Sequence, residues 1–440
     1  MRERNMLKQA LESGKTVSKA ARSKESTPPL SRSGSAAPSP RGSRIASREG
    51  SDDEDAFSDD TEWSTRSIDA LVAPPLEYDD GSDAWVAVLE DRINAIIDRK
   101  RSSTEGREND MSGFNLILTR HFAQQQLQPR ADEVVAALLK SVKAGQSERE
   151  VVLALKALAL IIITEPSETI YDSVADAFKR TINDSQYPNA KSAAIHALSV
   201  ATFYGGATLE ETEEIMDLFL DIASTDGAVI DEADNGDVVV AALEEWGFLC
   251  TQMDDMEEMT EPAMDTFVDQ LESSDVGVQI AAGINIALLY EKSYTEAESD
   301  DEPESDEEDG AKGPRMIKRY TVYRQQHNLE QILEKISKAS SKRVSKKDRK
   351  QLHLEFNDIL ATVEKPTRGP RYSTALDQDG REYGSRLKVT IHGGGKMTID
   401  KWWKLQRLNA LKRLLQSGFM VHYEFNQVVF DSLPVIVEDD

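Results

Sequence analysis

The residues of this sequence best suited to chemistry are clustered cations. Between Lys335 and Lys350, eight of sixteen residues are Lys or Arg, and only Asp348 is acidic. Closely spaced positive side chains bind phosphate groups and release the counterions held there, so the tract predicts contact with nucleic acid. A solvated helix face or a nuclear-import signal has the same composition, and charge alone leaves both alternatives open.

More cations follow in a helix expected from about Asp400 to Gln416. They alternate with an apolar stripe that includes Trp403 and Leu411, so we expect them on the exposed face of that helix. The candidate RNA-binding or ribosome-binding residues of the two groups are Lys342, Arg343, Lys346, Lys347, Arg349, Lys350, Lys401, Lys404, Arg407, Lys412 and Arg413.

Charge is divided unevenly along the chain, whose formal net charge is -27. Summed from the sequence, it is +7 over residues 1–50, -44 over 51–311, +15 over 312–413 and -5 over 414–440. An acidic body joined to a basic C-terminal module indicates a bipolar molecule whose two surfaces face different surroundings.

Other chemistries find little support. The single cysteine, Cys250, lies in an apolar run and is expected to be a buried core thiol. None of the six His residues forms an HxxxH or HxH pattern, and the glycines 393–395 lack the context of a phosphate-binding loop. The acidic residues offer no isolated carboxylate pair. We therefore expect no catalytic residue, no metal site, no cofactor and no enzymatic activity.

A repeated helical pattern accounts for most of the apolar residues. Nearly apolar, Ala- and Leu-rich helices recur, and aligning Leu158, Leu198, Trp246 and Ile284 separates them by 40, 48 and 38 residues. This is the period of armadillo and HEAT arrays, in which stacked helix pairs share one core. The sequence predicts an all-α fold: an armadillo/HEAT-like α-solenoid of about five pairs, then a small basic helical module with a short β-hairpin.

The remaining segments are divided by composition. Ser345 is expected to cap a helix over 346–363, and a strand over 386–392 is expected to pair with 396–399. A final helix is expected over about 423–432. The predicted organisation is a disordered Ser/Arg-rich and then acidic head (1–82), the helical repeat domain (83–294), an acidic disordered linker (295–313), a basic helical segment (314–366) and a C-terminal domain with the hairpin and helices (367–440).

Several stretches together resemble the interferon-related developmental regulator family. The basic segment 341–364 and the stretch KALALI at 156–161 are similar to parts of that family, over about residues 83–434 without the linker. Motif residues of the family match Ile399, Asp400, Trp402, Leu415, Gly418, His422, Asn426 and Leu433-Pro434.

The resemblance implies two activities. One is a ribosome-binding translational regulator, similar to factors that occupy the mRNA path and tRNA sites of idle ribosomes. The other is a nuclear transcriptional co-regulator or protein-interaction scaffold that uses the armadillo-like domain. The charge partition favours the first, because a basic helix fits an RNA-lined channel. Its partners would be ribosomal RNA and ribosomal proteins. A third alternative is an armadillo adaptor that binds peptides in its groove. We expect a monomer without membrane contact, located in the cytoplasm or also in the nucleus.

Overall fold

The computed structural model describes one compact unit, which falls within Ser58–Asp440. The residues described are 84–99, 102–296, 316–338, 345–371, 388–390 and 396–433. The expectations for the head 1–82, for most of the acidic linker and for residues after 433 therefore lie outside the described residues.

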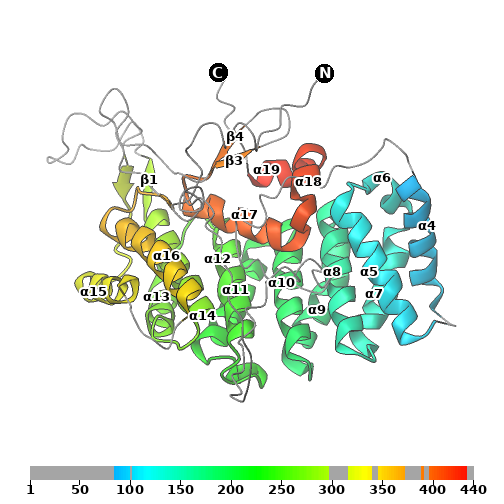
Figure 1. Ribbon diagram of the computed structural model, residues 1–440, viewed down its shortest axis with the longest axis horizontal. Coiled ribbons are helices and arrows are strands. Elements are labelled where there is room, and N and C mark those ends of the chain that lie inside the picture. The colour runs from blue at the N-terminus through cyan, green and yellow to red at the C-terminus, as the bar shows by residue number, and fades with distance from the viewer. Residues whose placement is uncertain are drawn as a thin grey trace, which may run out of the picture. The chain divides into compact units, whose positions relative to one another are not determined.

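Five helix pairs form the repeat domain, in a solenoid-like arrangement that confirms the predicted all-α fold class (Figure 1). The pairs are α4 (Ala84–Ile97) with α5 (Thr104–Arg120), α7 (Ala131–Ala144) with α8 (Glu148–Thr164), α9 (Glu168–Asp184) with α10 (Pro188–Tyr204), α11 (Leu209–Ser224) with α12 (Gly236–Cys250), and α13 (Glu257–Gln270) with α14 (Val276–Lys292). The short helices α6 (Gln124–Leu127) and η2 (Gln128–Arg130) join the first two pairs, and η3 (Ala228–Ile230) lies between α11 and α12 within the fourth pair.

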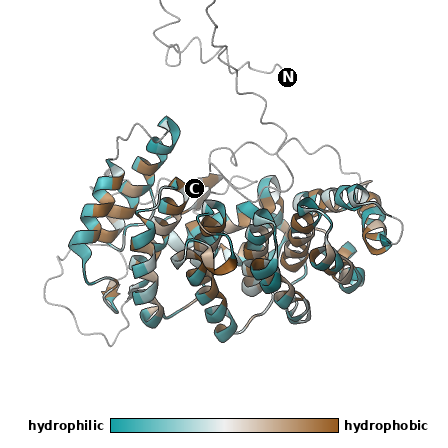
Figure 2. Ribbon diagram, turned by 90° about the horizontal axis from the view of Figure 1, so that it is seen from below, coloured by the Kyte–Doolittle hydropathy of each residue, from teal (hydrophilic) through white to brown (hydrophobic). Residues whose placement is uncertain are grey.

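The second helix of each pair is an inner helix, and these helices stack in the order α5, α8, α10, α12, α14. Being covered on several sides, α8 is buried without interruption from Glu150 to Thr164. The first helices pack through one stripe, as in α9, and remain polar on the side away from their neighbours (Figure 2). Side-chain caps fix several starts, including a complete capping box of Thr208 and Glu211 at α11.

A sixth helix pair continues this array. It consists of α15 (Gln326–Ser337) and α16 (Lys346–Glu364), which pack against each other, and α16 also packs against α14. The approach of α16 is close, since a Cβ at Gly283 of α14 would lie 2.7 Å from the Ile359 Cδ1 atom. The basic segment predicted as a module beyond the array therefore lies on it, and the start of α16 at the Ser345 cap is confirmed.

Two short strands bracket the acidic linker. Strand β1 (Tyr294–Glu296) pairs antiparallel with β2 (Met316–Lys318), with Tyr294 opposite Lys318 and Glu296 opposite Met316. The linker thus leaves and re-enters the fold at the same place. The sequence did not predict this pairing.

The C-terminal elements lie across the inner helices. After the predicted hairpin of β3 (Lys388–Thr390) and β4 (Lys396–Thr398), which the structure confirms, α17 (Trp402–Leu415) packs against α5, α8, α12 and α14 (Figure 1). Then follow η4 (Gln416–Gly418), α18 (Phe419–Phe425) and α19 (Gln427–Ser432). The single helix predicted over 423–432 is wrong, because the chain breaks at Asn426, whose side chain caps α19.

Candidate nucleic-acid interface

The first turn of α16 holds four cations at the surface. Lys346, Lys347 and Lys350 are exposed, and Arg349 is half-buried with its Nε atom 3.4 Å from the Ser345 carbonyl oxygen. Within the described part of the chain, none of these three lysines forms an ion pair. The side chains are therefore available to an external anion.

The backbone at this end of α16 also favours an anion. The Ser345 Oγ atom accepts a hydrogen bond of 3.1 Å from the Asp348 N–H, while the helix dipole places partial positive charge on the first turn. Positive side chains in that position oppose the dipole and give nothing to helix stability. An anionic partner would be attracted by the side chains and the helix end together.

The end of α15 lies beside this turn. The His353 Nδ1 atom of α16 is 3.0 Å from the Ser337 carbonyl oxygen, which joins the C-terminus of α15 to the second turn of α16. Lys335 and Lys338 near that terminus are exposed, although Lys338 pairs with Glu334. We call Lys335, Lys338, Lys346, Lys347, Arg349 and Lys350 the α15–α16 basic surface. Lys342 and Arg343, in the connection between the helices, lie outside the described residues.

The cations of α17 have a different environment. Lys412 and Arg413 are only 3% and 2% exposed, so the prediction that they bind RNA is wrong for this conformation. The Arg413 Nη2 atom lies 2.6 Å from Glu245 Oε1, and its Nη1 atom lies 3.2 Å from Glu244 Oε2. Burial and, to a smaller extent, the positive charge of Arg371 lower the pKa of Lys412 to about 8. Arg413 therefore supports the packing of α17 on α12, whereas the Lys412 ammonium group is buried without a hydrogen-bond partner in the described structure.

Arg407 is likewise engaged within the molecule. Its guanidinium donates to the Thr251 hydroxyl at 2.9 Å, to the Thr251 carbonyl at 3.0 Å and to the Ser432 carbonyl at 3.2 Å. It also stacks 5.1 Å from the ring of Phe203 and 5.0 Å from that of Trp403. Three of its five N–H donors are thus engaged within the molecule, and the predicted contact of Arg407 with RNA stays a prediction.

The two cations at the start of α17 keep partial exposure. Lys404 forms an ion pair of 2.6 Å with Asp400, four residues earlier, and Lys401 precedes the helix as its N-cap residue. Their predicted contact with RNA stays a prediction. The exposed cations of the described C-terminal part therefore concentrate on α15 and α16.

The family-motif residues dock the C-terminal elements on the array. Trp402 is fully buried, and its indole N–H donates to the Thr362 hydroxyl at 2.9 Å. The His422 Nε2 atom lies 2.8 Å from the Leu118 carbonyl, and the Asn426 amide donates to the Ile163 carbonyl at 2.9 Å. A Cβ at Gly418 would lie 1.7 Å from the Thr119 carbonyl oxygen, so only glycine fits. These motif residues are structural contacts.

Three polar residues of the inner helices, which the sequence prediction missed, receive α17. Glu291 accepts the backbone N–H groups of Trp402 and Trp403 at 2.9 and 3.1 Å and so caps α17 from another helix. The Gln406 amide donates to Asn285 Oδ1 at 2.8 Å, and Glu245 binds Arg413. Each is a polar residue inside a nearly apolar helix, and this signal is visible in the sequence.

Burial and pairing shift the pKa values of these groups in opposite directions. Burial raises the pKa of Glu291 to about 7, against the two N–H groups it accepts. Burial would also raise the pKa of Glu245, but Arg413 and His196 hold it down to about 2. Burial lowers the pKa of His422 to about 4, because its backbone contacts only partly offset the loss of water.

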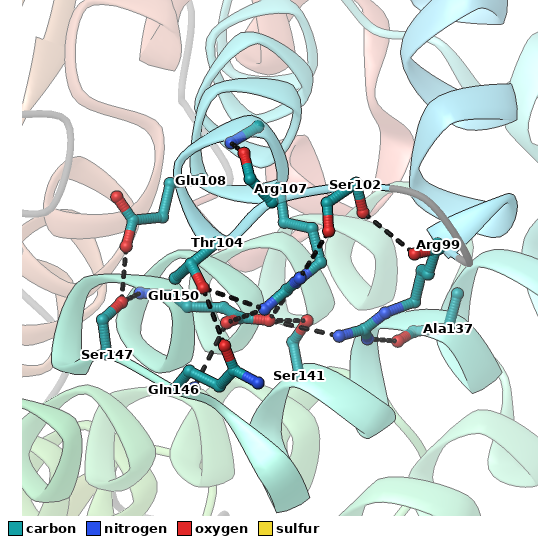
Figure 3. Close-up of polar contacts among 12 residues, drawn as sticks. Arg99, Ser102, Thr104, Arg107, Glu108, Ala137, Ser141, Gln146, Ser147 and Glu150 are labelled. Atoms are coloured by element: carbon teal, nitrogen blue, oxygen red, sulfur yellow. Dashed lines mark hydrogen bonds and ion pairs between the residues drawn. The ribbon is translucent and has the colours of Figure 1, made fainter.

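A polar cluster around Glu150 joins the first two helix pairs (Figure 3). The fully buried carboxylate accepts from Arg107 Nε and Nη2 at 2.7 Å each, from Arg99 at 3.1 Å and from Ser141 at 2.9 Å. The cavity beside it measures only ≈ 10 Å³, which is space for about one water molecule. With its charges paired and no space for a substrate, the cluster is structural.

The described residues contain neither a cluster of metal ligands nor a membrane-spanning helix. No three His, Cys, Asp or Glu side chains among them come together in a way that would hold a metal ion. No helix among them has the length and apolarity to cross a membrane.

Comparison with known proteins places the chain in a family. A family model described as interferon-related developmental regulator matches residues 52–364. An uncharacterized protein of Schizosaccharomyces pombe is 27% identical over 394 residues, which are 87% of this chain and 82% of that relative. Interferon-related developmental regulator 1 of Sus scrofa and of Homo sapiens are 23% and 22% identical over 373 residues, 80% of this chain and 73% of each relative. Because the family model covers well over half of the chain, the protein belongs to the interferon-related developmental regulator family.

Proposed function

We propose that this protein is a non-enzymatic translational regulator that binds ribosomal RNA through the α15–α16 basic surface. Bound there, it would occupy the mRNA or tRNA path of idle ribosomes. The observation that carries the proposal is the first turn of α16, where four cations crowd the positive end of a helix without helping its stability. The cost of these cations to the stability of the helix is explained if they bind a polyanion.

Two acidic helices of the array, α11 and α13, are unsuited to RNA binding. Helix α11 contains six acidic residues and α13 contains five, and neither contains Lys or Arg. These neighbouring helices would repel RNA. A polyanion would therefore avoid α11 and α13, and these acidic helices can face basic ribosomal proteins.

Sedimentation on sucrose gradients tests the proposal with the full-length chain. We expect comigration with 80S monosomes at low salt, and loss of comigration at high salt, because each phosphate contact releases counterions. Replacing Lys346, Lys347, Arg349 and Lys350 with Glu should abolish comigration at low salt as well. A wild-type protein that stays at the top of the gradient at low salt, in growing and starved cells alike, would refute the proposal.

A matched variant tests whether binding depends on the α15–α16 basic surface or on the net charge of the chain. Lys140, Lys143, Arg149 and Arg180 are exposed cations on α7, α8 and α9, away from α16. Replacing these four with Glu changes the net charge by the same amount. We expect this variant to retain monosome binding, and its loss would show that binding depends on net charge and not on the proposed surface.

The second candidate is a nuclear co-regulator or protein-interaction scaffold, with residues 342–350 serving import. One observation favours it: the acidic helices α11 and α13 present charge to the outside, where a basic protein could bind. The adaptor that binds peptides in its groove loses support, because α17 occupies the inner helices itself. We propose a cytoplasmic monomer for the first candidate, and a nuclear location in both growing and starved cells would favour the second.

A further inference from the structure

We propose that Ser345 is a phosphorylation site that switches the α15–α16 basic surface off. The inference rests on the proposed function, because it concerns the regulation of the same surface. Ser345 is exposed, and its backbone is extended, with φ -61° and ψ 159°. Its hydroxyl is engaged only as an acceptor for the Asp348 N–H in the described structure, so the oxygen lies at the surface.

The sequence around Ser345 carries the charge pattern that basophilic protein kinases select. Lys342 and Arg343 precede it by three and two residues, and charge patterning of this kind distinguishes kinase substrates. In the transfer, Ser345 Oγ attacks the γ-phosphorus of Mg-ATP. The bond from that phosphorus to the bridging oxygen of ADP breaks, ADP leaves, and the hydroxyl proton passes to the catalytic aspartate of the kinase.

Phosphoserine is compatible with the N-cap position of α16. A phosphate on an N-cap residue lies at the positive end of the helix dipole, where it can accept hydrogen bonds from first-turn N–H groups. Lys346, Lys347 and Lys350 lie within the next five residues and can pair with it. The modification should therefore leave α16 intact or strengthen its start, although Asp348 opposes it in part.

The same phosphate removes the charge that RNA needs. Residues 346–350 hold four cations and one acid, so their net charge is +3, and a phosphoserine with a charge of about -2 reduces it to about +1. The loss of about two phosphate contacts to single-stranded RNA changes how the binding constant depends on salt. The slope of the logarithm of the binding constant against the logarithm of the salt concentration becomes shallower by roughly 1.4. Near physiological salt this corresponds to about tenfold weaker binding.

The binding experiment uses the full-length chain with phosphoserine encoded at position 345. A matched control carries phosphoserine at Ser103, which is also an exposed N-cap serine but starts α5, beside Glu105. The probe is a fluorescent 20-nucleotide poly(U), titrated at several salt concentrations. We expect phosphoserine at 345 to weaken binding about tenfold and reduce the salt slope, with no change for phosphoserine at 103 and no fall in melting temperature for either protein.

Two results would overturn the inference while sparing the proposed function. In one, phosphoserine at 345 leaves poly(U) binding unchanged while the Lys346/Lys347/Arg349/Lys350→Glu variant binds weakly. In the other, a purified basophilic kinase with Mg-ATP labels other serines of the chain, as mapped by mass spectrometry, but never Ser345. If the fourfold Glu variant also binds poly(U) and ribosomes like the wild type, the proposed function itself fails.

Discussion

Two helices near the C-terminus, α16 and α17, each contain four Lys or Arg residues, yet the structure uses their charges in opposite ways. The cations of α16 gather on its first turn and face solvent, whereas Arg407, Lys412 and Arg413 of α17 are directed into the molecule. The acceptors explain the difference. Helix α17 lies on inner helices that offer Glu244 and Glu245 to Arg413 and the Thr251 carbonyl to Arg407, whereas Lys346, Lys347 and Lys350 of α16 form no ion pair within the described structure.

The role of a basic helix therefore depends on which hydrogen-bond acceptors and acidic side chains lie beside it, and not on its composition. An acidic residue inside an apolar helix, such as Glu245 in VVVAALEEWGFLC, requires a cation once it is buried. Arg413 of α17 meets that need. The exposed lysines of α16 have no such intramolecular role in the described structure, and we propose that they bind a partner outside the chain.

The strongest test of this contrast is Arg413→Ala. The substitution leaves Glu245, itself 2% exposed, without its main counter-charge, and should lower the free energy of unfolding by about 3–5 kcal/mol. Urea denaturation followed by circular dichroism measures the change. Lys350→Ala on α16 is the matched control and should change stability by less than about 0.5 kcal/mol. Equal losses in the two variants would contradict the distinction between the helices.

The second test uses pH and the Glu291 cap of α17. Because burial raises the folded pKa of Glu291 from 4.5 to about 7, the folded chain holds a proton that the unfolded chain releases above pH 4.5. The stability from that proton is complete below pH 4.5 and is lost as pH rises through 7. Asp400 and Lys401 face this carboxylate, with opposing effects on its pKa.

The variant Glu291→Gln isolates this effect. Between pH 4.5 and pH 8, the stability of the wild type relative to Glu291→Gln should fall by at most about 3 kcal/mol. Glu245 and His422 titrate in both proteins, so the difference reports Glu291 alone. Glu213→Gln, at an exposed position of α11, serves as the control and should follow the wild type. A difference that is constant with pH would show that folding does not raise the pKa of Glu291.

The third test concerns the fit of α17 on α12. A Cβ at Gly247 would lie 2.1 Å from Asn285 Oδ1 and 2.3 Å from Gln406 Nε2, so Gly247→Ala should cost about 1–3 kcal/mol through overpacking. Gly106→Ala in the first turn of α5 meets its nearest atom at 3.2 Å and should be neutral or slightly stabilising. Thermal unfolding compares the two. A neutral Gly247→Ala would mean that α17 sits more loosely than described.

The parts of the fold that the sequence predicted depend on local pattern. The apolar inner helices, the Ser345 cap and the β3–β4 hairpin all follow from residues close together in the chain. Periodicity identifies such elements because burial of one helix face repeats every three to four residues. The placement of α16 on α14 and the pairing of β1 with β2 required knowledge of which elements meet in space.

The docking of α17 escaped prediction for the same reason. Its contacts join residues more than a hundred positions apart, such as Gln406 with Asn285 and Trp402 with Glu291. An amphipathic basic helix is equally compatible with solvent and with an acidic receptor, so its own sequence does not decide. The part of the candidate site that lies on α16 was predictable. The N-cap and the apolar stripe of this helix determine which of its residues are exposed.

The smallest expected effect on stability is also the one that best separates function from folding. Lys346 and Lys347 oppose the dipole of α16, so replacing both with Glu should raise the free energy of unfolding, by about 0.3–1 kcal/mol per residue at low salt. Poly(U) binding by the same variant should weaken. Replacing exposed Lys140 and Lys143 with Glu, in the last turns of α7, should leave RNA binding unchanged and give no such gain, because acidic residues at a helix C-terminus oppose the dipole. A variant at 346 and 347 that loses stability would indicate that these lysines stabilise the fold, and the contrast between α16 and α17 would then disappear.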